Sequence, residues 1–201
     1  MGDIDRSHAP ATGGLLRALL RLLRRCGFDY ACFRVYRLPA GSSGSASPPP
    51  LPAGYRVAEL APAEVRTCPH PEIRNCEWYG GPGSYAFGVF DREGTPVCAQ
   101  WFWVGERYRA GNFWPLGATE AASMHLVTAP HERGKGLATH LKIASAESMR
   151  GNGFGNLYSR IWWTHRRSIR VSEKAGWSHI GTVLDVSVPG RSRPFRFVRR
   201  A

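Results

Sequence analysis

The sequence lacks a long hydrophobic run: no apolar stretch reaches the roughly 18 residues of a membrane-spanning helix. The apolar segment near the start is interrupted by arginines and lacks a small-residue cleavage pattern, so we expect no secretory signal. Cysteines are few and irregularly spaced, and Cys26, Cys32, Cys68, Cys76 and Cys98 include no C-x-x-C pair. This argues against a disulfide framework or a zinc cluster. We expect reduced thiols, no metal site and a cytoplasmic protein.

Acidic residues are also scarce: 15 Asp and Glu stand against 27 Lys and Arg, which gives a formal net charge of +12. This balance favours acidic partners, whether nucleic acid, an anionic membrane or a negatively charged small molecule. The charge alone does not choose among them, and a GC-rich genome also enriches arginine without any binding role. A polycationic substrate usually requires a carboxylate-rich site, and none is evident in the sequence.

Residues 14–25 combine arginines and leucines at helical spacing. At 100° per residue, the arginines fall within one arc of about 100° and the leucines cover the opposite side; they are Arg17, Arg21, Arg24 and Arg25. This predicts a basic amphipathic helix. It could lie on the inner face of a membrane, or pack against the protein's own domain or a second copy in a homodimer. Nucleic-acid binding is disfavoured, because the arginines of the C-terminal tail are spaced as the outward residues of a strand.

Composition divides the chain into three parts. Residues 1–38 form an N-terminal arm, in which 28–38 alternate between apolar and polar and predict a strand or an extended segment. Residues 39–54 are rich in Pro, Gly, Ser and Ala and predict a linker. Residues 55–201 form the main domain, which is long enough to bury a core.

Within the main domain, apolar patterns and turn residues predict both strands and helices. The expected strands cover 55–60, 84–90, 96–104, 121–128, 156–163, 177–188 and 193–199. One helix is expected over 134–151, and a second, capped by Thr164, runs to Ala175. Residues 61–80 are interrupted by prolines and predict short helices or turns. The expected fold is mixed α/β with a largely antiparallel central sheet.

A glycine-rich segment joins the strand ending at Thr128 to the following helix. Its sequence is Arg133-Gly134-Lys135-Gly136-Leu137-Ala138. Glycines allow the backbone to approach a ligand closely, and free amides at a helix start attract a pyrophosphate. The segment therefore predicts a site for a phosphate-bearing cofactor, although alone it also fits a structural tight turn.

A second motif, Glu173-Lys174-Ala175-Gly176-Trp177, follows after one helix and one strand. In this order the two motifs resemble the GNAT (Gcn5-related N-acetyltransferase) superfamily, with its signatures Q/R-x-x-G-x-G/A (here Arg133, Gly136 and Ala138) and E-K-x-G-[FYW]. The resemblance covers about residues 55–201. It implies the GNAT fold, with a mostly antiparallel sheet whose central strands splay apart. It also implies an acetyl-CoA-dependent N-acetyltransferase that acts on an amine of a small molecule, an amino sugar or a protein.

The resemblance further implies which residues hold acetyl-CoA, the co-substrate. The loop amides hold its pyrophosphate, and the residues concerned are Arg133, Gly134, Lys135, Gly136, Leu137, Ala138 and Thr139. The backbone of Leu126, Val127 and Thr128 pairs with the pantetheine arm, and the amide of Val127, or of a neighbour, holds the developing oxyanion. His165 replaces an asparagine common in relatives, three residues before Ser168; both are assigned to the cofactor.

An alkyl ammonium has a pKa near 10, so the attacking amine needs a base. Glu120 and His125 are the candidates by position, and a residue from 61–80 such as Glu77 is a further alternative. Strand alternation places His125 on the same face as Ser123 and Val127. For the general acid, many relatives carry a tyrosine two residues before the motif's lysine. Ser172 stands there, a far weaker acid, so water is an alternative proton donor to the thiolate.

The resemblance also implies that the acceptor binds beside residues 67–79 and an aromatic group on the far side of the sheet: Trp101, Phe102, Trp103, Phe113 and Trp114. The basic arm fits an acceptor at a membrane or an anionic one, such as a nucleotide-linked or lipid-linked amino sugar. A second hypothesis is a GNAT-fold module that binds acetyl-CoA without turnover and acts as a sensor or assembly factor. Ser172 keeps this second hypothesis open.

Overall fold

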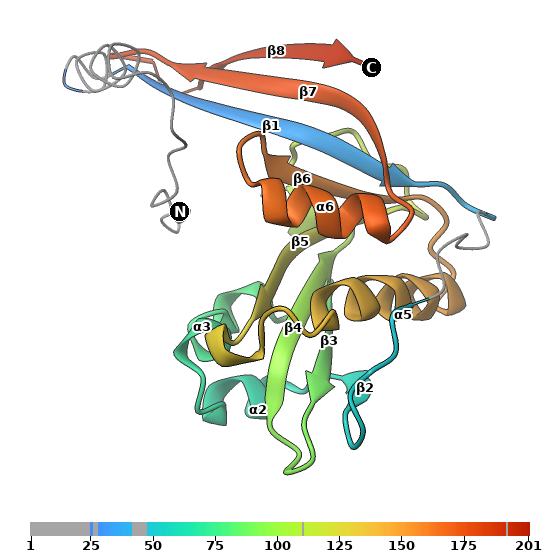
Figure 1. Cartoon of the computed structure of the whole chain (residues 1–201). Coiled ribbons are helices and arrows are strands. Elements are labelled where there is room, and N and C mark those ends of the chain that lie inside the picture. The colour runs from blue at the N-terminus through green and yellow to red at the C-terminus, as the bar shows by residue number, and fades with distance from the viewer. Residues whose placement is uncertain (1–24, 26–27, 42–47, 110, 192) are drawn as a thin grey trace.

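The computed structural model describes residues 25, 28–41, 48–109, 111–191 and 193–201. In these residues the chain forms an eight-stranded sheet of order β2-β3-β4-β5-β6-β1-β7-β8 (Figure 1). The strands are β1 (Asp29–Leu38), β2 (Arg56–Glu59), β3 (Ser84–Phe90), β4 (Pro96–Trp103), β5 (Ala121–Thr128), β6 (Leu157–Trp162), β7 (Ser178–Ser187) and β8 (Phe195–Arg200). Neighbouring strands are antiparallel, except that β5 and β6 are parallel.

Helices cover both faces of this sheet. They are α2 (Pro62–Thr67), α3 (Pro71–Arg74), α4 (Gly105–Arg109), α5 (Leu137–Gly151) and α6 (Arg166–Lys174), with short 3-10 turns η1 (Glu77–Tyr79) and η2 (Pro130–Glu132). On one face α5 and α6 bury Leu141 and Ile169 against the strands (Figure 1). On the other face α2 and α3 pack against Trp101 of β4. Further along that second face, α4 and the segment after it pack against β1, β6 and β7.

The strand β1 lies inside the sheet, where it pairs antiparallel with both β6 and β7. Its adjacent residues Val35 and Tyr36 are buried on opposite faces. The expected separation of residues 1–38 from the main domain is therefore corrected, because a strand of the arm completes the sheet. The alternation of apolar and polar residues predicts a strand and its two faces, but it does not predict which strands pair with it.

The other expected strands and helices are confirmed, with shifted ends. The helix expected from residue 134 begins at Leu137, after the glycine loop. The helix after β6 begins at Arg166, with His165 rather than Thr164 at the N-cap. The Thr164 hydroxyl is buried and has no hydrogen-bond partner in the described structure. The helix α4 was not expected from the sequence.

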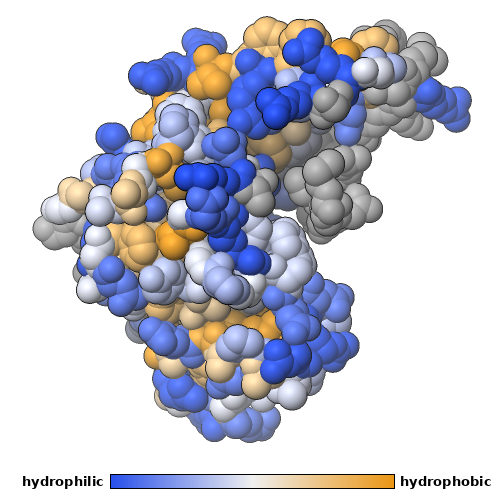
Figure 2. All heavy atoms as spheres, turned by 180° about the vertical axis from the view of Figure 1, so that it is seen from behind, coloured by the Kyte–Doolittle hydropathy of each residue, from blue (hydrophilic) through white to orange (hydrophobic). Residues whose placement is uncertain are grey.

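The amphipathic helix expected over residues 14–25 lies outside the described residues, apart from Arg25, which is helical. Among the described helices, none combines the length and apolar character needed to cross a bilayer. The four described cysteines are free thiols. Seen from behind, hydrophilic and apolar residues are mixed over the surface (Figure 2). Exposed apolar side chains include Phe195 and Phe197 of β8.

Candidate active site

The parallel strands β5 and β6 pair only over their first residues. The pairing runs from Ala121 opposite Leu157 to Ser123 opposite Ser159. At the same point β5 shifts register against β4: Trp101 lies opposite His125 and Phe102 lies opposite Ser123, so Met124 is an extra residue. Such a bulge bends a strand. It therefore accounts for the divergence of β5 from β6, after which this edge of β5 pairs with no strand in the described part of the chain and is called its free edge.

The backbone groups along this free edge follow from the ladder with β4. The amide of Ala129 donates to the carbonyl of Val97, its opposite residue, at 2.9 Å. In an antiparallel pair, hydrogen-bonded and non-hydrogen-bonded residue pairs alternate. Val127 therefore directs its amide toward β4, and Leu126 and Thr128 direct theirs toward the free edge. The amides that can reach a ligand in the gap are therefore those of the two neighbours, Leu126 and Thr128, and not the amide of Val127; Leu126 lies nearer to the bulge at Met124.

The glycine loop after β5 presents a row of amides to the same side of the molecule. Gly134 and Gly136 have φ of +87° and +79°, a conformation that favours glycine. Among the described residues, nothing accepts a hydrogen bond from the amides of five successive residues: Gly134, Lys135, Gly136, Leu137 and Ala138. Amides of this kind at the start of a 15-residue helix form a site for an anion.

The side chains of the loop are partly engaged. Lys135 Nζ donates to Glu132 Oε1 at 2.8 Å, and that hydrogen bond raises the pKa of the lysine. Tyr55 donates from its hydroxyl to Glu132 Oε2 at 2.9 Å. Arg133 donates from Nε to the carbonyl of Thr128 at 3.3 Å. Leu137 is buried in the core, so its contribution to a ligand is limited to its backbone.

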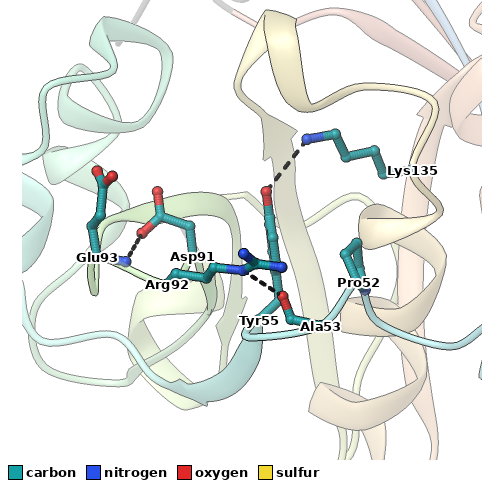
Figure 3. A pocket seen from close by; sticks show the side chains of 7 residues that line it. All are labelled: Pro52, Ala53, Tyr55, Asp91, Arg92, Glu93 and Lys135. Atoms are coloured by element: carbon teal, nitrogen blue, oxygen red, sulfur yellow. Dashed lines mark hydrogen bonds between the residues drawn. The ribbon is translucent and has the colours of Figure 1, made fainter.

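A cavity of about 330 Å³ lies beside Lys135 and Tyr55 (Figure 3). Its lining also includes Arg92, whose guanidinium points to the Ala53 carbonyl, and two acids, Asp91 and Glu93. The bases and acids balance, so the cavity has no strong net attraction for a phosphate. The loop amides are therefore a better candidate for an anion site than this cavity.

Part of the expected linker packs beside the loop. The carbonyl of Pro49 contacts His140 Nδ1 of α5 at 2.7 Å, and its ring would lie 3.4 Å from a Cβ placed on Gly136. Leu51 packs partly buried against the main core. Residues 48–51 thus line the start of α5, and the expected role as a plain spacer is corrected for them. A composition rich in Pro does not reveal such local packing.

His125 lies on the face that carries α2 and α3. Its ring stacks on Tyr79 with centroids 4.7 Å apart and lies 6.0 Å from the Trp101 ring. Ser123 faces the opposite side, where its Oγ accepts a hydrogen bond from Gln100. The expectation that His125 and Ser123 share a face is wrong, because the bulge at Met124 reverses the alternation. His125 and Val127 do share a face.

Glu120, the other candidate base, lies just before β5 at the end that is paired with β6. Its carboxylate accepts hydrogen bonds from the Gly117 amide at 2.7 Å, Asn156 Nδ2 at 2.7 Å and the Tyr158 hydroxyl at 3.1 Å. Burial raises the pKa of Glu120, but these hydrogen bonds outweigh it and hold the pKa below its usual range. The carboxylate therefore links the segment before β5 to β6 and to the residue that precedes β6.

The remaining candidates lie on two other elements. Ser172 is buried within α6, and Ser168 is exposed in the first turn of the same helix. His165 is the N-cap of that helix. Glu77 is exposed in η1, where it forms an ion pair with Arg66 at 3.4 Å. The chain thus brings His125, the free edge of β5 and the glycine loop together along one connected stretch, and Glu120 lies at the opposite end of that strand.

Two residues on the His125 face were missed as individual candidates. Tyr79 was included only as the end of an acceptor region, and Arg160 of β6 was not singled out. A signal for Arg160 was available, since it is a charged residue within an apolar strand. In the described residues, no group of His, Cys, Asp and Glu could hold a metal ion.

Comparison with known proteins identifies the fold. No protein-family model and no curated protein matches the sequence. A tandem GNAT protein from the clavulanic acid biosynthesis pathway superposes with a TM-score of 0.58 at 16% identity, covering 93% of this chain and 62% of that one. A GCN5-related N-acetyltransferase from Sphaerobacter thermophilus gives 0.54 at 13% identity, covering 87% and 58%. This chain therefore spans less than two thirds of each, and it has the GNAT fold.

Proposed function

We propose that this chain, which has the GNAT fold, is an acetyl-CoA-dependent N-acetyltransferase. The observation that carries the proposal is the free edge of β5, which opens at Met124 and leads directly into five amides that no described residue uses. The carbonyl of a thioester can accept a hydrogen bond from an amide of such an edge, and a pyrophosphate can accept hydrogen bonds from the amides of such a loop. The residues present fit the co-substrate, because glycines at positive φ leave the loop backbone accessible.

Each part of the stretch has a role in holding the co-substrate. The loop amides from Gly134 to Ala138 bind the pyrophosphate. The carbonyl of Leu126 and the amide of Thr128 hydrogen-bond the pantetheine arm, as an added strand would. When bound, acetyl-CoA supplies an acyl group activated for attack by an amine. The Leu126 amide stabilises the negative charge that develops on the carbonyl oxygen.

His125 serves as the general base. Its imidazole receives a proton from the acceptor ammonium, which frees the nitrogen lone pair for attack on the carbonyl carbon. The C–S bond then breaks, and water protonates the departing thiolate because Ser172 is too weak an acid. Glu120 is the weaker candidate, since three hydrogen bonds stabilise it as a structural carboxylate.

Calorimetric titration with acetyl-CoA, followed by thiol release on a panel of amines, tests the proposal. Binding together with release on at least one amine supports it. Binding without release on any amine supports instead a non-catalytic acetyl-CoA module, the second hypothesis. Absence of binding contradicts both.

A further inference from the structure

Arg160 occupies a distinctive place on β6. It is the first residue after Ser159, where the pairing of β6 with β5 ends, and so it flanks the gap between the two strands. Its opposite residue on β1 is Val35, which is buried on the face away from α5. Arg160 therefore projects to the same face as His125, on the other side of the gap.

The contacts of the Arg160 guanidinium are with aromatic rings. Its Cζ lies 4.9 Å from the Phe33 ring centroid and 5.5 Å from that of Phe113. Within the part of the chain that the structure describes, no carboxylate or carbonyl oxygen accepts a hydrogen bond from it. Ring faces stabilise a cation, but they leave its five N–H groups without strong acceptors.

The nearby carboxylate of Asp185 does not accept a hydrogen bond from Arg160. Asp185 is engaged by Arg196, whose Nε and Nη2 donate to its two carboxylate oxygens at 2.7 and 2.8 Å. Burial lowers the pKa of Arg160 and outweighs the opposing effect of the Asp185 charge, and the guanidinium stays protonated at neutral pH. Its charge also acts on Tyr79, the ring stacked on His125.

We propose that Arg160 binds a carboxylate of the acceptor, so that the substrate is an amine carrying a carboxylate, such as an amino acid. The inference rests on the proposed function, because it places the anion site across the gap from the base His125. A planar fork of donors matches a carboxylate in bidentate geometry. A single cation also balances a single negative charge, whereas a phosphate monoester calls for a second free base, and the neighbouring Arg196 is already paired.

The test compares acids with their amides in turnover and in binding. Glycine, leucine, phenylalanine and glutamate, and the corresponding α-amides, serve as acceptors with acetyl-CoA. Their N-acetylated forms, again as acids and α-amides, serve as ligands in calorimetry with CoA present. We expect the wild-type protein to prefer the best acid over the corresponding amide. In Arg160→Met, kcat/KM for that acid and the affinity for its N-acetylated form should fall by about 10- to 100-fold. The affinities of the variant for the N-acetylated amide and for acetyl-CoA should stay unchanged.

Two variants control for folding and for charge. Arg160→Lys keeps the charge but removes the fork, so an intermediate loss is expected. Arg56→Met removes an arginine that lies 4.5 Å from the Phe90 ring, away from the gap, and keeps the acid preference. Thermal melts establish that each variant is folded.

The possible results separate this inference from the proposed function. Turnover without preference for acids, or a preference that Arg160→Met and Arg160→Lys both retain, overturns the inference and leaves the acetyltransferase intact. Arg160-dependent binding of acids without turnover of any amine overturns the proposed function alone. A wild-type protein that binds neither acids nor amides, and acetylates neither, overturns the inference.

Discussion

The two ends of β5 differ in how their polar groups are satisfied. At the first end, Ala121 to Ser123 pair with β4 or β6, and the carboxylate of Glu120 beside them accepts three hydrogen bonds. At the second end, beyond the bulge at Met124, one edge of the strand pairs with no described strand, and the strand continues into a loop whose amides no described residue accepts. If the proposed function holds, stability and ligand binding are thus separated along eight residues. A substitution at the first end should affect folding, and one at the second should affect activity.

The largest effect is expected at the second end, for His125→Phe. The new ring can keep the stacking on Tyr79 but cannot accept a proton, so kcat should fall by about 10²- to 10⁴-fold with little change in melting temperature. Steady-state kinetics with the best acceptor measure this effect. The matched control is His179→Phe on β7, which contacts Tyr36 and should leave kcat unchanged. Full activity of His125→Phe would remove the base from the proposed mechanism.

The first end predicts the opposite result for Glu120→Gln. Loss of a carboxylate that holds Gly117, Asn156 and Tyr158 should lower the free energy of unfolding by about 2 kcal/mol while kcat stays near wild type. Because the pKa of Glu120 is lowered in the folded state, its stabilisation is complete at pH 7 and declines as the pH falls through the folded pKa. Urea unfolding at pH 7 and near pH 4 should therefore show a difference that narrows in acid.

Glu77→Gln is the control for that experiment, since its ion pair with Arg66 is exposed and should contribute little. If Glu120→Gln abolished turnover at unchanged stability, the two ends of β5 would not divide as described. If Glu77→Gln reduced kcat strongly, the base would lie in η1.

The loop that continues the second end is tested by Gly136→Ala. An alanine at φ +79° is strained by about 1 to 2 kcal/mol, and its Cβ would lie 3.4 Å from the Pro49 ring. We expect the affinity for acetyl-CoA to fall about tenfold in calorimetry. Gly153→Ala has the same backbone strain at φ +88° with no atom within 4 Å, and should retain full affinity. Equal affinities in the two variants would argue against a ligand at the loop.

Much of the fold could be predicted from the sequence, because its signals are local. The glycine loop between β5 and α5 was predicted from its own residues, Gly134 and Gly136, which have positive φ in the structure. The strand limits 121–128 and 84–90 agree with the structure because alternation and turn residues act over a few neighbours. The order of strands and helices along residues 55–201 was predicted for the same reason, because each element has its own local pattern.

The remaining features depend on contacts that a local pattern does not contain. The position of β1 between β6 and β7 is a choice of partners, which periodicity leaves open. The bulge at Met124 adds one residue without a marker in the sequence, and this single insertion reverses the face of Ser123 relative to His125. The sequence marks Arg160 only as a charged residue within an apolar strand, and the neighbouring strands are needed to show that it lies at the gap.

Lys142 tests whether groups without strong hydrogen-bond partners occur only at the second end of β5. It is a buried lysine on α5, away from the free edge of that strand. Its Nζ lies 4.0 Å from the Trp177 ring centroid, and burial lowers the pKa of the lysine to about 7. The unfolded chain then binds more protons than the folded one between pH 7 and about 10, so stability rises with pH there. In Lys142→Met this rise is absent. Urea unfolding should show that the wild type gains about 2 kcal/mol of stability relative to the variant from pH 7 to 9. Parallel curves would mean that Lys142 keeps its proton in the folded state, and that a charge can be satisfied at this place in the core.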